Sequence, residues 1–300
     1  VESYPELSCG GVARWGKDFS VPLCPGNDGL LQFAKDVYSQ IFSLFPFGYV
    51  HIGADEVEQT HWKNCPKCQA RIKAEGLADE NGLQAWFVKE MQNFFAANGK
   101  KLIGWDEILE GKLAPNATVM SWRGTKGGYE AVALGHDVIM TPNTHCYLDY
   151  YQSRRIQDEP FAIGGFVNVE KVYSFEPYTP EMTPEQRAHI LGVQANLWTE
   201  YIKTPEHLEY MLLPRMSALS EVQWCAPEKK DYRRFLDKMS SMVKIYQKLG
   251  YNFARHIFEV QPVIGVDVEN ACPLVRLETQ GDAPMYYTLD GSEPTVSSTL

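Results

Sequence analysis

Hydrophobic positions along the first 250 residues follow two spacings that alternate. Leu30, Phe33, Val37 and Ile41 lie three or four positions apart, which predicts a helix that begins after residue 27 and ends before Pro46. The largely apolar run at 49–52 follows directly and is typical of a short buried strand. Because helix and strand patterns continue to alternate along the chain, the sequence predicts an α/β fold.

Five segments have the composition of buried strands, at 49–52, 101–105, 118–122, 136–140 and 190–195. Further helices are predicted at 83–98, 128–134, 205–224 and 231–249. Strands that alternate with helices pair in parallel. No glycine-rich phosphate loop follows any of these strands, which disfavours a nucleotide-binding doubly wound sheet. We therefore predict a (β/α)8 barrel, in which the active site lies at the carboxyl ends of the strands.

The pattern changes after about residue 255. The segments 263–268, 274–277 and 285–289 look like strands and lack helical spacing, and Asp290-Gly291 is a strong turn signal. We predict a barrel domain over residues 1–254, followed by the beginning of a small β-sandwich over residues 255–300.

Composition narrows the possible functions. The chain has 44% hydrophobic residues, enough to bury a core, and a net charge of -10 from 38 acidic and 28 basic residues, which argues against a nucleic-acid partner. No apolar run approaches the roughly 18 to 20 residues that span a bilayer. No signal peptide is visible after Val1.

The seven cysteines are odd in number and irregularly spaced, which does not indicate a disulfide framework. Cys65-Pro-Lys-Cys68 is a single CxxC motif, with His51 and His61 nearby in the sequence. A structural zinc site needs four ligands, and no second CxxC exists. We therefore predict two thiols in a loop or one local disulfide rather than a metal site, and no cofactor.

Asp55 and Glu56 come directly after the strand predicted at 49–52. Adjacent carboxylates repel each other, which raises at least one pKa and leaves one group protonated near neutral pH. A proton donor beside an anion is what cleavage of a glycosidic bond requires. A solvated acidic turn is the alternative interpretation of such a pair taken alone.

Three tryptophans favour a sugar pocket. Trp105, Trp122 and Trp198 each fall at the carboxyl end of a different predicted strand, and these ends converge in a barrel. A pyranose packs its axial C–H groups on an aromatic face while its hydroxyls need polar partners. One such tryptophan is more often part of a core, but three beside an acid pair favour a pocket.

A long connection at 143–188 separates the fourth and fifth predicted strands, and a connection of that length is usually functional. It carries Tyr147 and Asp149, which are candidates for the pocket. Glu200, two residues after Trp198, adds another carboxylate at the same end of a strand.

Several motifs, in order, resemble the family 20 glycoside hydrolases, the β-N-acetylhexosaminidases. The resemblance covers residues 1 to about 250, and 290–294 looks like part of the small β-domain that follows the barrel in many bacterial members. The matching motifs are His51-Ile-Gly-Ala-Asp55-Glu56, Gly104-Trp105-Asp106-Glu107, Ser121-Trp122-Arg123, Tyr147-Leu-Asp149 and Gln194-Ala-Asn-Leu-Trp198-Thr-Glu200.

The resemblance implies a retaining, substrate-assisted mechanism, an exception to the scheme with two catalytic carboxylates. Glu56 would protonate the glycosidic oxygen and then activate water, while the 2-acetamido carbonyl of the substrate attacks C1 and forms an oxazolinium ring. Asp55 would hold the acetamido N–H, and Tyr147 would donate to the acetamido oxygen. The remaining residues would enclose the sugar and bind its hydroxyls: Trp105, Trp122, Trp198, Asp149 and Glu200.

The resemblance also implies that the five strands are strands four to eight of the barrel. Family members have three earlier strands and a sugar-binding arginine, so we expect little hexosaminidase activity from this 300-residue chain alone. The resemblance to this family also favours an exported protein.

Two alternatives remain open. In the first, Glu200 acts as a protein nucleophile in ordinary double displacement, with Glu56 as the acid. In the second, the chain is a carbohydrate-binding fragment without catalysis. The expected partner in each case is an N-acetylhexosamine-containing oligosaccharide or glycoconjugate, and the sequence does not distinguish N-acetylglucosamine from N-acetylgalactosamine.

Overall fold

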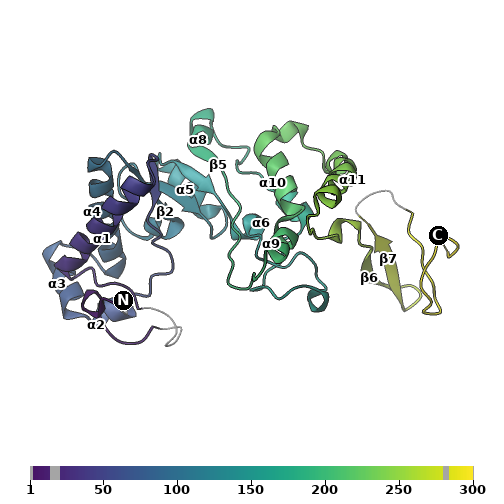
Figure 1. Ribbon diagram of the computed structural model, residues 1–300, viewed down its shortest axis with the longest axis horizontal. Coiled ribbons are helices and arrows are strands. Elements are labelled where there is room, and N and C mark those ends of the chain that lie inside the picture. The colour runs from purple at the N-terminus through teal and green to yellow at the C-terminus, as the bar shows by residue number, and fades with distance from the viewer. Residues whose placement is uncertain (1–2, 14–20, 280–283, 300) are drawn as a thin grey trace. The chain divides into compact units, whose positions relative to one another are not determined.

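The computed structural model describes residues 3–13, 21–279 and 284–299 of the chain (Figure 1). These residues form two compact units. The first comprises Val1–Asn143 and Pro177–Gln194, and the second comprises Thr144–Glu176 and Ala195–Leu300.

The first unit contains a sheet of five parallel strands. Its strands follow one another in chain order: β1 (Tyr49–His51), β2 (Lys101–Trp105), β3 (Thr118–Ser121), β4 (Val138–Met140) and β5 (Ile190–Val193). Each connection between neighbouring strands is a crossover, so all five carboxyl ends lie at one edge of the sheet. The predicted positions of the strands and their parallel pairing are confirmed.

The other elements of the first unit are helices and 3-10 turns. They are η1 (Pro5–Leu7), α1 (Asp28–Leu44), α2 (Thr60–Asn64), α3 (Pro66–Ala74), α4 (Glu80–Ala97), η2 (Asp106–Glu110), α5 (Lys126–Ala133) and α8 (Pro184–Ala188). Helix α4 begins where the Asp79 side chain accepts a hydrogen bond from Gly82 N–H. Its buried face carries Leu83, Met91 and Phe95, and Phe95 meets Tyr38 of α1 at 4.8 Å between ring centroids.

The central strands of the sheet are the most deeply buried. All four residues of β3 are buried, and Val119, Val138 and Met140 are completely inaccessible to solvent. Strands buried on both faces have near-continuous apolar sequences, which explains why β2, β3 and β4 could be predicted without an alternating pattern.

The second unit is mainly helical. Its elements are α6 (Asn143–Cys146), η3 (Ile156–Asp158), α7 (Val169–Tyr173), α9 (Pro205–Leu212), α10 (Arg215–Trp224), η4 (Pro227–Lys229), α11 (Tyr232–Leu249) and η5 (His256–Phe258). The first residue of α6, Asn143, is assigned to the first unit. The single helix predicted at 205–224 is wrong, because the structure has two helices there. Pro214 has no N–H to continue the helical ladder and restricts the residue before it, so α9 ends at Leu212.

Helix α11 matches its prediction closely. The Asp231 side chain accepts from Arg234 N–H at the start, and Gly250 takes the left-handed conformation at the end, with φ 75°. Phe235, Met239 and Val243 recur on its buried face.

The chain continues into an antiparallel pair of strands, β6 (Gln261–Asp267) and β7 (Cys272–Glu278). The strand predicted at 285–289 is wrong, because only Tyr287 pairs there, in an isolated bridge with Thr299. The turn at 290–291 is confirmed: Gly291 has φ 80° and the Asp290 carboxylate accepts from Ser292 N–H at 3.0 Å. The domain boundary near residue 254 stays a prediction.

Within the described residues, no helix combines the length and the apolar character that crossing a bilayer would demand.

Candidate active site

The acid pair lies on a tight turn at the carboxyl end of β1. Hydrogen bonds from Ile52 N–H to the Ile103 carbonyl (2.8 Å) and from Trp105 N–H to the Gly53 carbonyl (2.9 Å) extend the pairing with β2 beyond the strand itself. The chain then turns sharply through left-handed conformations at Gly53 (φ 78°), Ala54 (φ 72°) and Glu56 (φ 47°).

Left-handed conformations are costly for residues other than glycine and are concentrated at functional sites. Here the neighbouring helix restrains the turn, because Gln84 of α4 donates from Nε2 to the Ala54 carbonyl at 3.0 Å. Asp55 and Glu56 are both exposed, so neither carboxylate serves the core. The turn therefore holds two adjacent carboxylates toward solvent at the edge where the strands end.

His51, the last residue of β1, supports this turn. Its Nδ1 accepts from Gly53 N–H at 2.9 Å, which assigns the ring proton to Nε2, and its ring packs on Trp105 at 4.9 Å between centroids. Burial lowers the pKa of His51, although the nearby Asp55 carboxylate opposes that effect. Nε2 is buried and has no hydrogen-bond partner in the part of the chain that the structure describes.

Trp122 is held by two acidic residues that follow β2. Its indole Nε1 donates to Glu107 Oε2 at 2.9 Å, and its backbone N–H donates to Asp106 Oδ2 at 3.0 Å. Arg123 completes the cluster with a 2.6 Å bond from Nε to Asp106 Oδ1. Burial raises the pKa of Glu107, while hydrogen bonding to Trp122 opposes the rise.

Asp106 and Glu107 were part of a recognised motif, but the sequence did not reveal their role. Both are buried, and they fix the orientation of the indole of Trp122, the residue that directly follows β3. A pair of acidic residues directly after a strand-ending tryptophan was the available signal. The first unit thus brings Asp55, Glu56, Trp105 and Trp122 to the same edge of one sheet.

Tyr147 and Trp198 come together in the second unit although they are far apart in the sequence. Two extended segments lie side by side, joined by hydrogen bonds from Leu148 N–H to the Asn196 carbonyl (2.7 Å) and from Asn196 N–H to the Cys146 carbonyl (2.9 Å). The rings of Tyr147 and Trp198 are 6.4 Å apart between centroids. Burial raises the pKa of Tyr147 to about 12, against hydrogen bonds with the side chains of Asn196 and Trp198, so its hydroxyl keeps a proton to donate.

Asp149 lies on the same pair of segments. Burial raises the pKa of Asp149 to about 6; hydrogen bonds from its own backbone and that of Trp198 and the charge of Arg215 act against the rise, and the charge of Glu200 adds to it. Its Oδ1 is buried and lacks a hydrogen-bond partner among the described residues. A buried carboxylate oxygen without a partner is suited to accept from a ligand hydroxyl.

Arg215 organises the segment that carries Tyr147 and Asp149, a role that sequence patterns do not reveal. Its side chain is fully buried, and it donates from Nη2 to the Leu148 carbonyl at 2.5 Å and from Nη1 to the Val167 and Tyr150 carbonyls at 2.8 and 3.0 Å. Burial lowers the pKa of Arg215 to about 9, with the Asp149 charge opposing that shift. It remains the cation that balances Asp149.

Cysteines form the one group of three or more histidine, cysteine, aspartate or glutamate side chains that could hold a metal ion within the described ranges. They are Cys9, Cys24, Cys65 and Cys68, so the candidate metal ligands include neither member of the acid pair.

Carboxylates and indole rings at the carboxyl ends of parallel strands indicate an α/β enzyme, because the active site of such folds lies at that edge of the sheet. Comparison with known proteins agrees with this class. The family described as glycosyl hydrolase family 20, catalytic domain, matches residues 1–227. The chain belongs to this family, which confirms the resemblance found in its motifs.

Individual relatives extend the match over the whole chain. The chain is 41% identical over 309 aligned residues to a β-hexosaminidase of Porphyromonas gingivalis, covering 100% of this chain and 39% of that protein. It is similar in structure to an exo-β-N-acetylglucosaminidase of Vibrio harveyi in complex with N-acetylglucosamine (TM-score 0.71, 30% identity, 78% of this chain and 37% of that one). A β-N-acetylhexosaminidase of Bacteroides fragilis gives a TM-score of 0.72 at 28% identity, over 84% of this chain and 51% of that one.

The chain spans only part of these relatives, between 33% and 52% of the length of the first four curated ones.

Proposed function

We propose that the protein containing this chain hydrolyses terminal, non-reducing β-linked N-acetylhexosamine from oligosaccharides or glycoconjugates. The acid pair carries the proposal: Asp55 and Glu56 are exposed on a left-handed turn at the end of a parallel strand, in a family whose matched region is its catalytic domain. The N-acetylglucosamine bound by the Vibrio harveyi relative supports the substrate class.

The proposed reaction retains configuration at C1. Glu56 gives its proton to the glycosidic oxygen while the C1–O bond breaks and the substrate's own acetamido oxygen bonds to C1. This forms an oxazolinium ring and releases the aglycone alcohol. Glu56, now a carboxylate, takes a proton from water, which attacks C1, opens the ring and restores the acetamido group.

The other residues act on the acetamido group and the sugar ring. Asp55 accepts from the acetamido N–H and stabilises the positive charge that develops on the ring. Tyr147, which keeps its proton because of burial, donates to the acetamido oxygen. Indole rings of Trp105, Trp122 and Trp198 pack on the sugar and its methyl group, and Asp149 and Glu200 accept from hydroxyls.

Architecture follows from the same family assignment. We propose that β1 to β5 correspond to strands four to eight of a (β/α)8 barrel, and that β6 and β7 begin a β-sandwich. We propose on the resemblance alone that the protein is exported.

Substitution of the acid tests the function. In the full-length protein, Glu56→Gln is expected to lower kcat/KM for an aryl β-N-acetylglucosaminide by about 100- to 10,000-fold, because general acid–base catalysis contributes that much. Binding of the sugar is expected to persist. Glu130→Gln, on the exposed face of α5, is the matched control and should leave kcat/KM unchanged.

Two further outcomes decide between mechanisms. A thiazoline analogue of the oxazolinium should inhibit competitively and tightly. Weak inhibition together with a trapped covalent glycosyl–Glu200 adduct would support double displacement instead. If wild type binds the sugar but never cleaves it, the chain is a carbohydrate-binding module and the proposal fails.

A further inference from the structure

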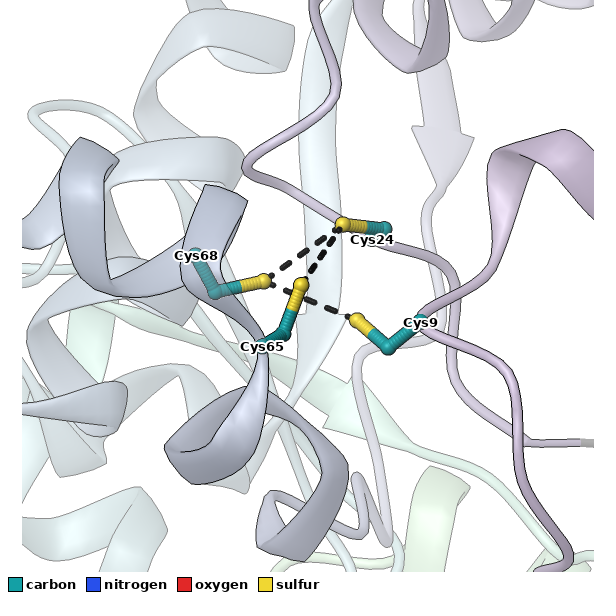
Figure 2. Close-up of side chains that lie close together, drawn as sticks. All are labelled: Cys9, Cys24, Cys65 and Cys68. Carbon is teal, nitrogen blue, oxygen red and sulfur yellow. Dashed lines mark hydrogen bonds between the residues drawn. The ribbon is translucent and has the colours of Figure 1, made fainter.

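Four cysteines from three separate segments meet in the first unit (Figure 2). Cys9 follows η1, Cys24 precedes α1, and Cys65 and Cys68 lie at the start of α3. Their sulfur atoms all lie within 4.8 Å of one another. Figure 2 shows the four side chains pointing toward a common centre.

The spacing of the sulfurs matches a single tetrahedral ion. Three of the Sγ–Sγ distances are 3.5 Å (Cys24–Cys68), 3.6 Å (Cys9–Cys68) and 3.7 Å (Cys24–Cys65). Four thiolates at about 2.3 Å from a zinc ion form a tetrahedron with edges of about 3.8 Å. A disulfide needs about 2.05 Å between sulfurs, and an iron–sulfur cluster interposes several atoms between its cysteines and so requires a wider separation.

Backbone donors are arranged around the sulfurs as a thiolate site requires. Cys68 N–H donates to Cys65 Sγ, and Gly26 N–H donates to Cys68 Sγ. Such bonds orient metal-bound thiolates and disperse their charge. Gly26 also allows the close approach of the two segments, because a Cβ there would lie 2.2 Å from the Lys67 carbonyl carbon.

The site is enclosed by apolar side chains. Cys24 and Cys68 are buried at 1% and 0% exposure, together with Trp62 and Leu83. The Trp62 indole donates to the Leu23 carbonyl at 2.9 Å, which fixes the residue before Cys24. Four thiols packed together in such surroundings have few good acceptors for their weak S–H donors, whereas a metal ion would use all four sulfurs.

We propose that Cys9, Cys24, Cys65 and Cys68 bind one structural zinc ion. Zn²⁺ displaces one proton from each thiol, so that Zn²⁺ and four thiols give a tetrathiolate complex of charge −2 and release four protons. All four positions are filled by the protein, which is typical of a structural rather than a catalytic site.

The ion joins the segments around Cys9 and Cys24 to helices α2 and α3. Val57, which directly follows Glu56 in the sequence, packs against the cysteine cluster. The zinc site therefore anchors the chain immediately behind the acid pair. This role would stand whatever reaction the acid pair performs.

Metal analysis of the full-length protein, purified without chelator, tests the proposal. We expect one zinc per chain by elemental mass spectrometry, and an X-ray absorption signal of four sulfurs at about 2.3 Å from zinc. Cys24→Ser and Cys68→Ser are each expected to lose the zinc. Cys225→Ser, at the end of α10, changes a cysteine outside the cluster and should keep it.

A second measurement covers variants that fail to fold. Wild-type protein refolded with Co²⁺ in place of zinc should show intense thiolate-to-cobalt charge-transfer bands and the visible bands of a tetrahedral site. An equivalent of iron instead of zinc would overturn the assignment to zinc. Disulfides among the four cysteines, found by mass after alkylation, or a zinc-supplemented protein with free thiols and no metal, would overturn the site. None of these readouts depends on hydrolysis, so they are separate from the test of the proposed function.

Discussion

Burial gives Asp149 a pKa of about 6, and this value has a consequence for binding. Below that pH the folded protein holds Asp149 as a neutral acid, and above it the group is an ionised acceptor. If the carboxylate accepts from a sugar hydroxyl, as proposed, affinity is lost as the pH falls through about 6. We expect KM to rise over this range more steeply than kcat falls.

The Asp149→Asn variant isolates this effect. It should have a raised KM at all pH values and lack the increase below pH 6, measured as KM against pH on a neutral aryl glycoside. Asp158→Asn, on exposed η3, should keep the wild-type profile. If KM of Asp149→Asn also rises below pH 6, another group causes the pH dependence.

The backbone of the acid turn gives a second prediction at the level of single residues. Ala54 has φ 72°, which glycine adopts freely and β-branched residues strongly resist. Ala54→Val should lower the free energy of unfolding by about 1 to 3 kcal/mol, and Ala54→Gly should change it by less than about 1 kcal/mol. Chemical denaturation of the full-length protein measures both. Equal destabilisation by valine and glycine would mean that packing of the Ala54 methyl group, rather than its conformation, matters.

Among the elements, the connection between α9 and α10 shows how a helix end supports a candidate site. Arg215 is the first residue of α10, and its guanidinium reaches the carbonyls of Leu148, Tyr150 and Val167 from two other segments. Because the segment of Leu148 and Tyr150 also carries Tyr147 and Asp149, the start of α10 fixes the part of the chain to which sugar-binding roles are assigned.

Replacing Arg215 with methionine should be severely destabilising. The variant leaves several buried carbonyls without a donor, each costing about 1 to 3 kcal/mol, so we expect a loss of about 3 to 5 kcal/mol in denaturation experiments. Arg215→Lys should recover only part of this, because a single ammonium cannot replace the guanidinium fork. Lys244→Met, on the exposed surface of α11, is the control and should cost less than about 0.5 kcal/mol. A comparably small loss for Arg215→Met would contradict the organising role.

At the scale of the whole chain, net charge predicts how substrates are selected. These 300 residues contribute a charge of -10 to the full-length protein, and that contribution repels an anionic glycan more than a neutral one. KM for a sulfated N-acetylglucosaminide should fall as ionic strength rises from about 0.01 M to 0.15 M, because the Debye length shortens from about 30 to 8 Å. KM for the unsulfated glycoside should be unaffected by salt and serves as the reference. Parallel behaviour of the two substrates would exclude an effect of net charge.

Local patterns were sufficient for the sheet and most helices. β1 to β5 could be predicted because each is a short apolar run between helices, and α11 because its caps and its periodicity agree. The prediction of one helix at 205–224 was wrong at Pro214. The apolar spacing continues across this residue, although proline has no backbone N–H to donate.

Such local patterns do not predict contacts between residues that are distant in the sequence. The CxxC motif predicts two thiols in a loop or one local disulfide, whereas the structure brings its sulfurs close to those of Cys9 and Cys24. A single sequence contains no signal for that partnership. Arg215 looked like an ordinary charged residue of a helix. Asp55, Glu56 and the tryptophans were identifiable because strand ends carry them directly.

The paired segments of Tyr147 and Trp198 also bear on how the protein folds. Leu148 bonds to Asn196, so a long stretch of chain must be closed into a loop before this contact forms, whereas the acid turn needs only β1 and β2. Contacts between distant residues form slowly because the entropy of loop closure must first be overcome. During synthesis, the turn that bears Glu56 is therefore complete while the residues assigned to holding the sugar have still to meet, and a nascent chain acquires its reactive acid before its selectivity.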